Sequence, residues 1–239
     1  MSTRYGRTPG GFVWALLEPV GAILILSVAF SFLMRSPALG SSFPLFYATG
    51  YLPFATYQSV SNSVARSLSF SRPLLAYPAV TWLDALLARF ALNFLTSVMI
   101  AYVLLTAFVF LSETRAVIEI IPIIVAMALA GLFGLAVGTL NCALFGMFPI
   151  WEVIWSIVTR PLFLASGVII LYDHMPRPLQ NIVWYNPLLH ISGEMRRGFY
   201  AMYAPQYISL GYVVGVTMVL LTLGLVLLRR FSRQILTDG

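Results

Sequence analysis

The stretch SRPLLAYPAV, residues 71–80, separates two long apolar runs and decides how the rest of the chain is interpreted. It is too short and too polar to cross a bilayer, and too hydrophobic for a solvated loop. The runs on either side cover residues 43–64 and 82–111. Each is long enough for a membrane span, which needs about 20 mainly apolar residues. The stretch is therefore interpreted as a short connection that lies at one surface of a membrane.

The composition of the whole chain supports this interpretation. Of its 239 residues, 60% are hydrophobic and 9% are charged, which is far outside the usage of soluble proteins. No stretch is polar enough for a soluble domain, and no internal repeat is evident. Residues 1–239 are therefore expected to form a single transmembrane domain.

Hydropathy predicts an all-α integral membrane protein with six spans. The approximate limits of the spans are residues 12–34, 43–64, 82–111, 116–148, 155–171 and 208–228. The third and fourth runs exceed what a bilayer requires, which implies tilt or extension beyond the hydrocarbon. An even number of spans places both termini on the same side of the membrane.

Arginines in the flanking segments predict which side that is, because cytoplasmic segments carry an excess of positive charge. The arginines on the terminal side are Arg4, Arg7, Arg66, Arg72, Arg160, Arg229, Arg230 and Arg233. Those on the opposite side are Arg35, Arg115, Arg177, Arg196 and Arg197. The imbalance favours cytoplasmic termini, and residues 71–80 then face the cytoplasm.

Several chemistries are disfavoured by residues that the chain lacks. The chain contains arginine and no lysine, so no P-loop can be written, because that motif needs a lysine for the phosphates. The sequence contains no H-E-x-x-H, no G-x-S-x-G and no acidic pair at metal spacing, so we name no catalytic residue and no metal ligand. No acidic residue lies at mid-depth for a proton relay. The one cysteine, Cys142, excludes an intrachain disulfide.

The second predicted span carries a stripe of aromatic residues. Six of them project within about 140° of one another when placed at 100° per residue on a helical wheel. They are Phe43, Phe46, Tyr47, Tyr51, Phe54 and Tyr57. Two interpretations stay open: helix packing with an interfacial belt, or a conduit whose ring faces stack on sugars.

Charged and small residues within the spans give further hypotheses. A charge at the bilayer centre costs about 2.5–3.5 kcal/mol on insertion scales, and Glu18 and Arg89 lie nearer the cytoplasmic ends. Arg89 either extends to the membrane surface, pairs with Glu18, or lines an aqueous entrance. Gly134 and Gly138 have the small-xxx-small spacing of close helix contacts, which serves either the core of one chain or a dimer seam.

The connection over residues 172–207 is rich in aromatics and prolines, and its apolar pieces have the length of short helices. We expect interfacial or re-entrant helices here, because unpaired backbone is tolerated at membrane depth only where protein or water satisfies it. Asp173 and His174 are interpreted as a polar rim. Arg196 and Arg197 either meet an anionic sugar or phosphate, or anchor at lipid headgroups.

Residues 71–80 are predicted to contain one or two helical turns between Pro73 and Pro78. The side chains available for contacts are Arg72, Leu74, Leu75 and Tyr77. The helix either lies on lipid or serves as a handle for a cytoplasmic partner. Because the chain has no ATP site and no proton carrier, it is interpreted as the passive half of a two-component pump.

Three stretches together resemble a known family. They are RYGRTPGGFVWALLEP before and within the first span, SRPLLAYPAV after the second, and SGVIILYDHMPRPLQNIVWYNPLLHISGEMRRGFY after the fifth. The last contains Pro176, Asn186, Pro187 and the Arg196/Arg197 pair. In this order the stretches are similar to the membrane permeases of type-2 ABC transporters, especially exporters of capsular polysaccharide, with O-antigen exporters next. Family members usually have a longer amphipathic helix before the first span, whereas about eleven residues precede Phe12 here.

The resemblance implies a homodimer in the bacterial inner membrane, driven by two copies of an ATP-binding subunit that holds ATP and magnesium. Residues 71–79 would be the coupling helix, and the cargo would be a lipid-linked capsular polysaccharide. Similar exporters also engage a periplasmic co-polymerase and an outer-membrane channel, and no nucleic acid is expected. Alternatives are export of O-antigen, a teichoic-acid-like polymer or a hydrophobic drug, or a self-sufficient channel or secondary carrier.

Overall fold

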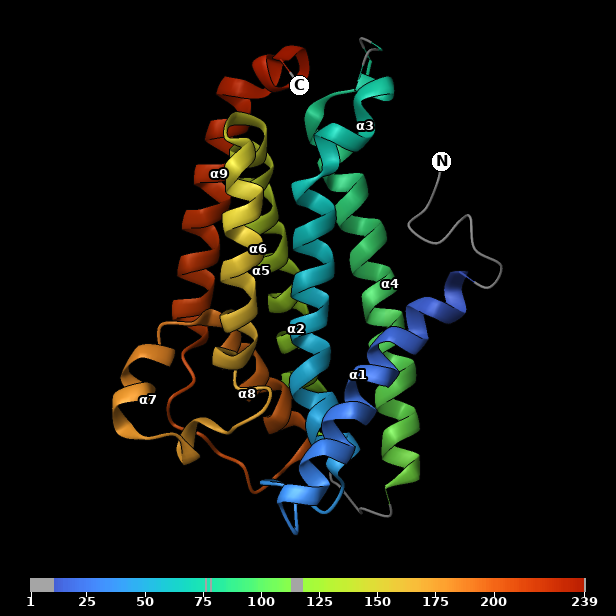
Figure 1. The fold of residues 1–239 in the computed structure, drawn as a ribbon, viewed down its shortest axis with the longest axis vertical. Coiled ribbons are helices and arrows are strands. Elements are labelled where there is room, and N and C mark those ends of the chain that lie inside the picture. Colours follow the sequence, from blue (N-terminus) through green and yellow to red (C-terminus); the bar gives the residue numbers. More distant parts are fainter. Residues whose placement is uncertain (1–10, 76, 78, 113–117, 239) are drawn as a thin grey trace.

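The computed structural model describes residues 11–75, 77, 79–112 and 118–238. Every regular element of this part of the chain is helical, as expected (Figure 1). The helices are α1 (Gly11–Leu33), α2 (Phe43–Ala65), α3 (Ser67–Leu75), α4 (Trp82–Leu111), α5 (Ile120–Met147), α6 (Pro149–Ala165), a 3-10 turn η1 (Tyr172–His174), α7 (Arg177–Val183), α8 (Pro187–Phe199) and α9 (Leu210–Asp238). The predictions that concern Arg4, Arg7, Arg115 and the amino-terminal segment lie outside the described residues.

The centre of the molecule is the pair formed by α2 and α5. Helix α5 packs against α2, α8 and α9, while α2 also packs against α1 and α4. One cluster of buried apolar side chains extends through most of the bundle. A second, smaller cluster lies near α3 and includes Leu68, Leu86 and Leu228.

Two glycines bring α5 against α2. A Cβ atom on Gly138 would lie 2.8 Å from the backbone oxygen of Ser61, and one on Gly134 would lie 2.9 Å from that of Tyr57. The predicted close approach is therefore present. It serves the core of a single chain, and its physical basis is the missing side chain, which lets the two backbones nearly touch.

Local signals explain where several helices begin. Thr81 and Asp84 form a capping box at the start of α4, in which the Thr81 hydroxyl accepts from the Asp84 amide and the Asp84 carboxylate accepts from the Thr81 amide. The Asn186 side chain accepts from the Leu188 amide at the start of α8, and Pro187 occupies its first turn. Pro44 likewise lies in the first turn of α2, so it does not interrupt that helix.

Four helices are long and apolar enough to cross a membrane by length and composition. They are Trp14–Leu33, Trp82–Leu111, Ile120–Met147 and Leu210–Ser232. Helix α2 is less apolar because it carries Thr, Ser, Gln and Asn residues, and α6 has 17 residues. Length and hydropathy thus support four of the six predicted spans.

The predicted limits of the fifth span are wrong by six residues at each end. Helix α6 covers Pro149–Ala165 instead of residues 155–171. A proline in its first turn favours the earlier start, and Gly167, with φ 71°, turns the chain just after its end. Arg160 consequently lies inside α6, which removes it from the arginines that flank the spans.

The short helices divide between the two ends of the bundle. Helix α3 and the carboxyl-terminal end of α9 lie at one end, and α7 and α8 lie toward the other (Figure 1). The connection between α6 and α9 contains short helices, as predicted. All residues of α8 except Arg197 are buried, so this helix lies within the protein.

Candidate functional site

The first candidate site is α3 and the turn that follows it. The sequence predicts a helix over residues 71–79, whereas the structure has it four residues earlier, at Ser67–Leu75, with Pro73 inside it. Ser67, Leu68 and Ser71 face the bundle. Pro73 has no amide hydrogen, so the last turn of α3 lacks one helical hydrogen bond.

The remaining side chains of α3 form an exposed apolar and basic surface. Phe70, Leu74 and Tyr77 are 53%, 48% and 66% exposed, and Arg72 is half-buried. Leu75 instead packs against the smaller buried cluster. The four predicted contact residues therefore divide into Arg72, Leu74 and Tyr77, which a partner can reach, and Leu75, which supports the fold.

Charged groups near α3 are held by other elements. The Arg89 guanidinium in α4 lies over the Phe70 ring, 3.9 Å from its centroid. Arg66, at the end of α2, forms an ion pair with Glu152 in the first turn of α6. The contact that the structure gives Arg89 is thus with an aromatic ring of α3.

The aromatic stripe of α2 lies mainly in the core. Phe46, Tyr47, Phe54 and Tyr57 are buried, and Tyr57 stacks on Phe133 of α5 at a ring separation of 5.2 Å. Within one chain these four side chains have the packing role that the sequence left as an alternative. The two other members of the stripe are only partly buried.

Tyr51 and Phe43 are these partly buried members. The Tyr51 ring meets Phe163 of α6 edge-on at 6.4 Å, and Glu18 of α1 acts electrostatically on Tyr51. Tyr51 therefore lies where α1, α2 and α6 approach one another. Its neighbours thus include a carboxylate from α1 and an aromatic ring from α6.

Arg196 does not occupy either position that the sequence suggested for it. Its side chain is 1% exposed and donates to the backbone oxygens of Gly167 and Val168 at 2.6 and 2.9 Å. It also lies over the Phe46 ring, 4.5 Å from the centroid. Arg196 thus connects α8 to the turn after α6 and to α2.

Arg197, the next residue, is half-exposed and pairs with buried Glu194 at 3.2 Å. Burial raises the pKa of Glu194, and the Arg197 guanidinium opposes this rise. Asn186 also has a structural contact, because its amide donates to the backbone oxygen of Ala165. Pro176 precedes α7 and Pro187 opens α8, so both prolines set helix starts.

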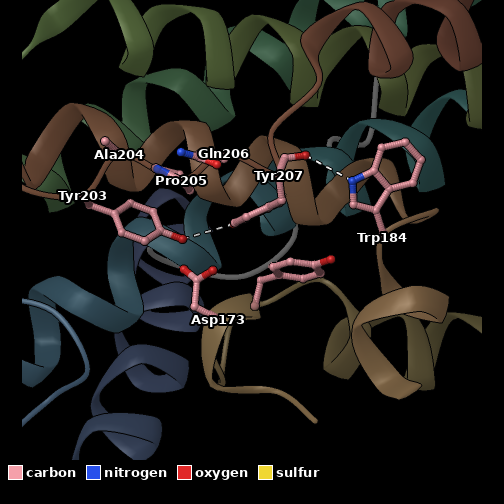
Figure 2. A pocket seen from close by; sticks show the side chains of 8 residues that line it. Asp173, Trp184, Tyr203, Ala204, Pro205, Gln206 and Tyr207 are labelled. Carbon is pink, nitrogen blue, oxygen red and sulfur yellow. Dashed lines mark hydrogen bonds between the residues drawn. The ribbon is translucent and has the colours of Figure 1, made fainter. Parts of the chain in front are cut away.

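The structure also shows an open pocket that the sequence reasoning missed. Its volume is about 610 Å³, and it lies between η1, the end of α7 and the segment before α9 (Figure 2). The lining residues are Tyr172, Asp173, Trp184, Tyr203, Ala204, Pro205, Gln206 and Tyr207. The only sequence signal was the density of aromatics in residues 172–207, because the three segments are brought together by the fold.

The pocket side chains are ordered by contacts with one another. The Tyr203 and Tyr207 hydroxyls are 3.2 Å apart, and Trp184 Nε1 donates to the Tyr207 backbone oxygen at 3.2 Å (Figure 2). The rings of Tyr172 and Tyr207 lie 4.3 Å apart. Burial raises the pKa values of Tyr203 and Tyr207, so both phenols stay protonated at neutral pH.

Comparison with known proteins identifies the family. Residues 1–200 match the family described as ABC-2 type transporter. Polysialic acid transport protein KpsM of Escherichia coli is 28% identical over 99% of this chain and 92% of its own length. The capsule polysaccharide export inner-membrane proteins CtrC of Neisseria meningitidis and BexB of Haemophilus influenzae are 27% and 26% identical, each over 98% of this chain and 88% of their length. The chain therefore belongs to the ABC-2 type transporter family.

Proposed function

We propose that the chain is the membrane permease of an exporter that moves lipid-linked capsular polysaccharide from the cytoplasm across the bacterial inner membrane. The observation that carries this proposal is the full-length similarity to proteins named for capsule polysaccharide export, on an all-helical fold with apolar helices of spanning length. The chain is a transport subunit. ATP binding and hydrolysis with magnesium belong to a separate partner, because a lysine-free sequence cannot form a P-loop.

The proposed membrane arrangement has six spans, with α2 and α6 added to the four most apolar helices. Polar side chains of α2 do not argue against a span, because Thr49 and Thr56 donate to backbone oxygens of their own helix. Helix α6 has no buried residue within the single chain, which suits a helix that meets lipid or a second copy. Both termini then lie in the cytoplasm, on the side of α3.

Helix α3 is the proposed coupling helix. It lies at the end of the bundle away from α7 and α8, and it exposes the apolar side chains Phe70, Leu74 and Tyr77 beside Arg72. An exposed apolar patch with a basic residue fits a protein partner better than water. In the proposed assembly two permease copies and two ATP-binding subunits form the exporter. A periplasmic co-polymerase and an outer-membrane channel receive the polymer.

The docking proposal predicts that Leu74→Asp prevents coupling without preventing insertion. We expect co-purification of the ATP-binding subunit to fall at least about tenfold, because central apolar contacts of an interface carry 2 kcal/mol or more. Polysaccharide at the cell surface is expected to fall with it. The measurements are pull-down of the ATP-binding subunit from native membranes and surface staining of polymer.

The matched control is Leu179→Asp on α7, because Leu179 is also half-exposed and lies on a helix toward the opposite end of the bundle. It is expected to leave co-purification unchanged. Leu75→Asp is unsuitable because Leu75 packs inward. Normal co-purification and normal export in the Leu74→Asp variant would exclude α3 as the docking site.

A further inference from the structure

We propose that the pocket between η1, α7 and the segment before α9 binds an uncharged sugar unit of the exported glycan. This inference rests on the proposed export function and adds the class of sugar to it. The pocket lies toward the end of the molecule opposite α3 (Figures 1 and 2). In the proposed export the glycan moves from the α3 side toward this end of the molecule, where the pocket is open.

The size and lining of the pocket suit a sugar. Its volume of about 610 Å³ lies within the range of small-molecule sites, about 300–1,000 Å³. Four of the lining residues are aromatic, namely Tyr172, Trp184, Tyr203 and Tyr207. The apolar faces of sugar rings stack on aromatic side chains, and a tyrosine or tryptophan also presents a polar edge. Apolar faces and polar edges thus occur together in this pocket.

The polar groups of the pocket match sugar hydroxyls. Each phenol has one donor and two acceptor positions, and Tyr203 and Tyr207 use only one donor on each other. One phenolic proton is therefore free for a ligand oxygen or for Asp173. The exposed carboxylate of Asp173 points toward this tyrosine pair (Figure 2), and a carboxylate can only accept hydrogen bonds. Together these groups supply donors and acceptors for adjacent hydroxyls.

The charge of the pocket disfavours acidic sugars. Asp173 is the one charged side chain among the eight lining residues. Buried Arg196 does not line the pocket, and its amino groups bind the Gly167 and Val168 carbonyls. A sugar carboxylate would thus face the Asp173 carboxylate with no cation among the lining residues to offset the repulsion. Repulsion between the two carboxylates would make the pocket select against acidic sugars.

The sugar class proposed for this pocket differs from the one for which a relative is named. The Escherichia coli relative is named for polysialic acid, a polymer whose sugars carry carboxylates. The pocket of the present chain is suited to a polymer with uncharged units at the site of contact. Among capsule polysaccharides, the proposed cargo is therefore one that contains uncharged sugar units.

Saturation-transfer NMR on the full-length chain in lipid nanodiscs tests the proposal. The probes are neutral trimers of glucose, galactose, mannose and N-acetylglucosamine, and the trimer of sialic acid. We expect at least one neutral trimer to bind, and the sialic acid trimer to bind at least about tenfold more weakly, a difference of 1.4 kcal/mol. Binding of none of the neutral trimers, or equal binding of the sialic acid trimer, would overturn the proposal.

Three variants locate the binding. Tyr172→Ala is expected to weaken the neutral trimer up to about tenfold, because aromatic contacts contribute about 0.5–1.5 kcal/mol. Tyr185→Ala is the control, since Tyr185 is exposed in the same connection but does not line the pocket. Asp173→Asn, at an exposed position that does not endanger folding, is expected to reduce the preference for neutral over acidic trimers. An unchanged preference in Asp173→Asn would contradict the charge argument.

Failure of the pocket proposal can be told apart from failure of the proposed export function. The measurement that does so is ATP-dependent export by the complex of this chain with its ATP-binding partner. Export of polymer by a protein whose pocket binds no neutral trimer would overturn the pocket assignment and leave the export function standing. Binding of a neutral trimer by a complex that exports nothing would overturn the export function instead.

Discussion

Arg196 and Arg197 are neighbours in the chain with opposite surroundings. The sequence predicted one shared role for the two arginines. In the fold, Arg196 donates to two backbone carbonyls in the interior, whereas Arg197 is half-exposed and pairs with buried Glu194. Successive residues of a helix differ by 100° in direction, so adjacent arginines cannot share a face. Which of the two faced inward depended on the packing of α8 against α2 and α5.

The Arg197–Glu194 pair predicts a pH-dependent effect of Arg197→Ala. Burial raises the pKa of Glu194 above its unfolded value, so the folded state loses stability as the pH rises and the carboxyl ionises. Removing Arg197 takes away the group that opposes this rise. The free energy of unfolding of the variant is therefore expected to fall by about 1–2 kcal/mol at pH 8 and by less at pH 5. The value is this small because solvent partly screens the half-exposed Arg197.

Thermal unfolding in one detergent at both pH values measures this effect. The control is the double variant Arg197→Ala with Glu194→Gln, in which the difference between pH 5 and pH 8 relative to the Glu194→Gln protein should vanish. Equal destabilisation by Arg197→Ala at the two pH values would show that Glu194 is not the titrating group.

Tyr51 is one of the two partly buried stripe residues, and unlike Phe43 it has a polar edge that could meet a passing glycan. Tyr51→Ala is expected to lower the export rate about two- to tenfold, which corresponds to the loss of one aromatic contact. Tyr51→Phe keeps the ring and should export nearly normally. Export is measured as surface polymer per inserted permease, with exposed Tyr102→Ala as the control. Normal export by Tyr51→Ala would leave the stripe with a packing role alone.

At the scale of helices, the contact between α2 and α5 depends on Gly138. A methyl group there would meet the Ser61 backbone oxygen and the Val64 side chain at 2.8 Å, so the helices must move apart. Gly138→Ala is expected to lower the free energy of unfolding by about 1–3 kcal/mol, as overpacked cores do. Gly215→Ala on α9 has open space around it and should be neutral or stabilising by up to about 1 kcal/mol.

The measurement is the thermal unfolding midpoint of each variant relative to that of the unchanged protein. Gly215→Ala is a matched control because both variants add the same methyl group to a long helix. An unfolding midpoint of the Gly138→Ala protein equal to that of Gly215→Ala would contradict the close contact.

Helix limits were predictable where the chain itself signals them. The limits predicted for the third span, residues 82–111, agree with those of α4, whose capping box at Thr81 and Asp84 is local. The sequence predicted one or two turns between Pro73 and Pro78, and the resemblance implied a helix over residues 71–79, whereas α3 covers Ser67–Leu75. Proline restricts the residue before it and removes one donor, but it does not fix a boundary within one turn of a helix end.

At the scale of the whole molecule, the proposed orientation predicts which ends are accessible from each side. Tyr77 follows α3 and Met202 follows α8, and both are exposed. Cysteine placed at either position is unique once buried Cys142 is replaced by alanine. An impermeant maleimide applied to spheroplasts is expected to label the Met202→Cys variant, and the Tyr77→Cys variant only after permeabilisation.

The opposite labelling pattern would place the termini outside, and labelling of both variants from the same side would contradict the six-span arrangement. Unreacted Cys142 in the unchanged protein is the control, because its side chain is buried.

The sequence alone determined the helical class, the limits of several helices and the resemblance to type-2 ABC permeases. These properties follow from hydrophobicity and short motifs along the chain, because the insertion of a segment into a bilayer depends on its own length, hydrophobicity and flanking charges. Tertiary structure decided the direction of Arg196, the burial of four stripe aromatics and the assembly of Asp173, Trp184 and Tyr203 into one pocket. The physical reason is that these features depend on contacts between segments distant in the sequence, and such contacts are fixed only when the helices pack.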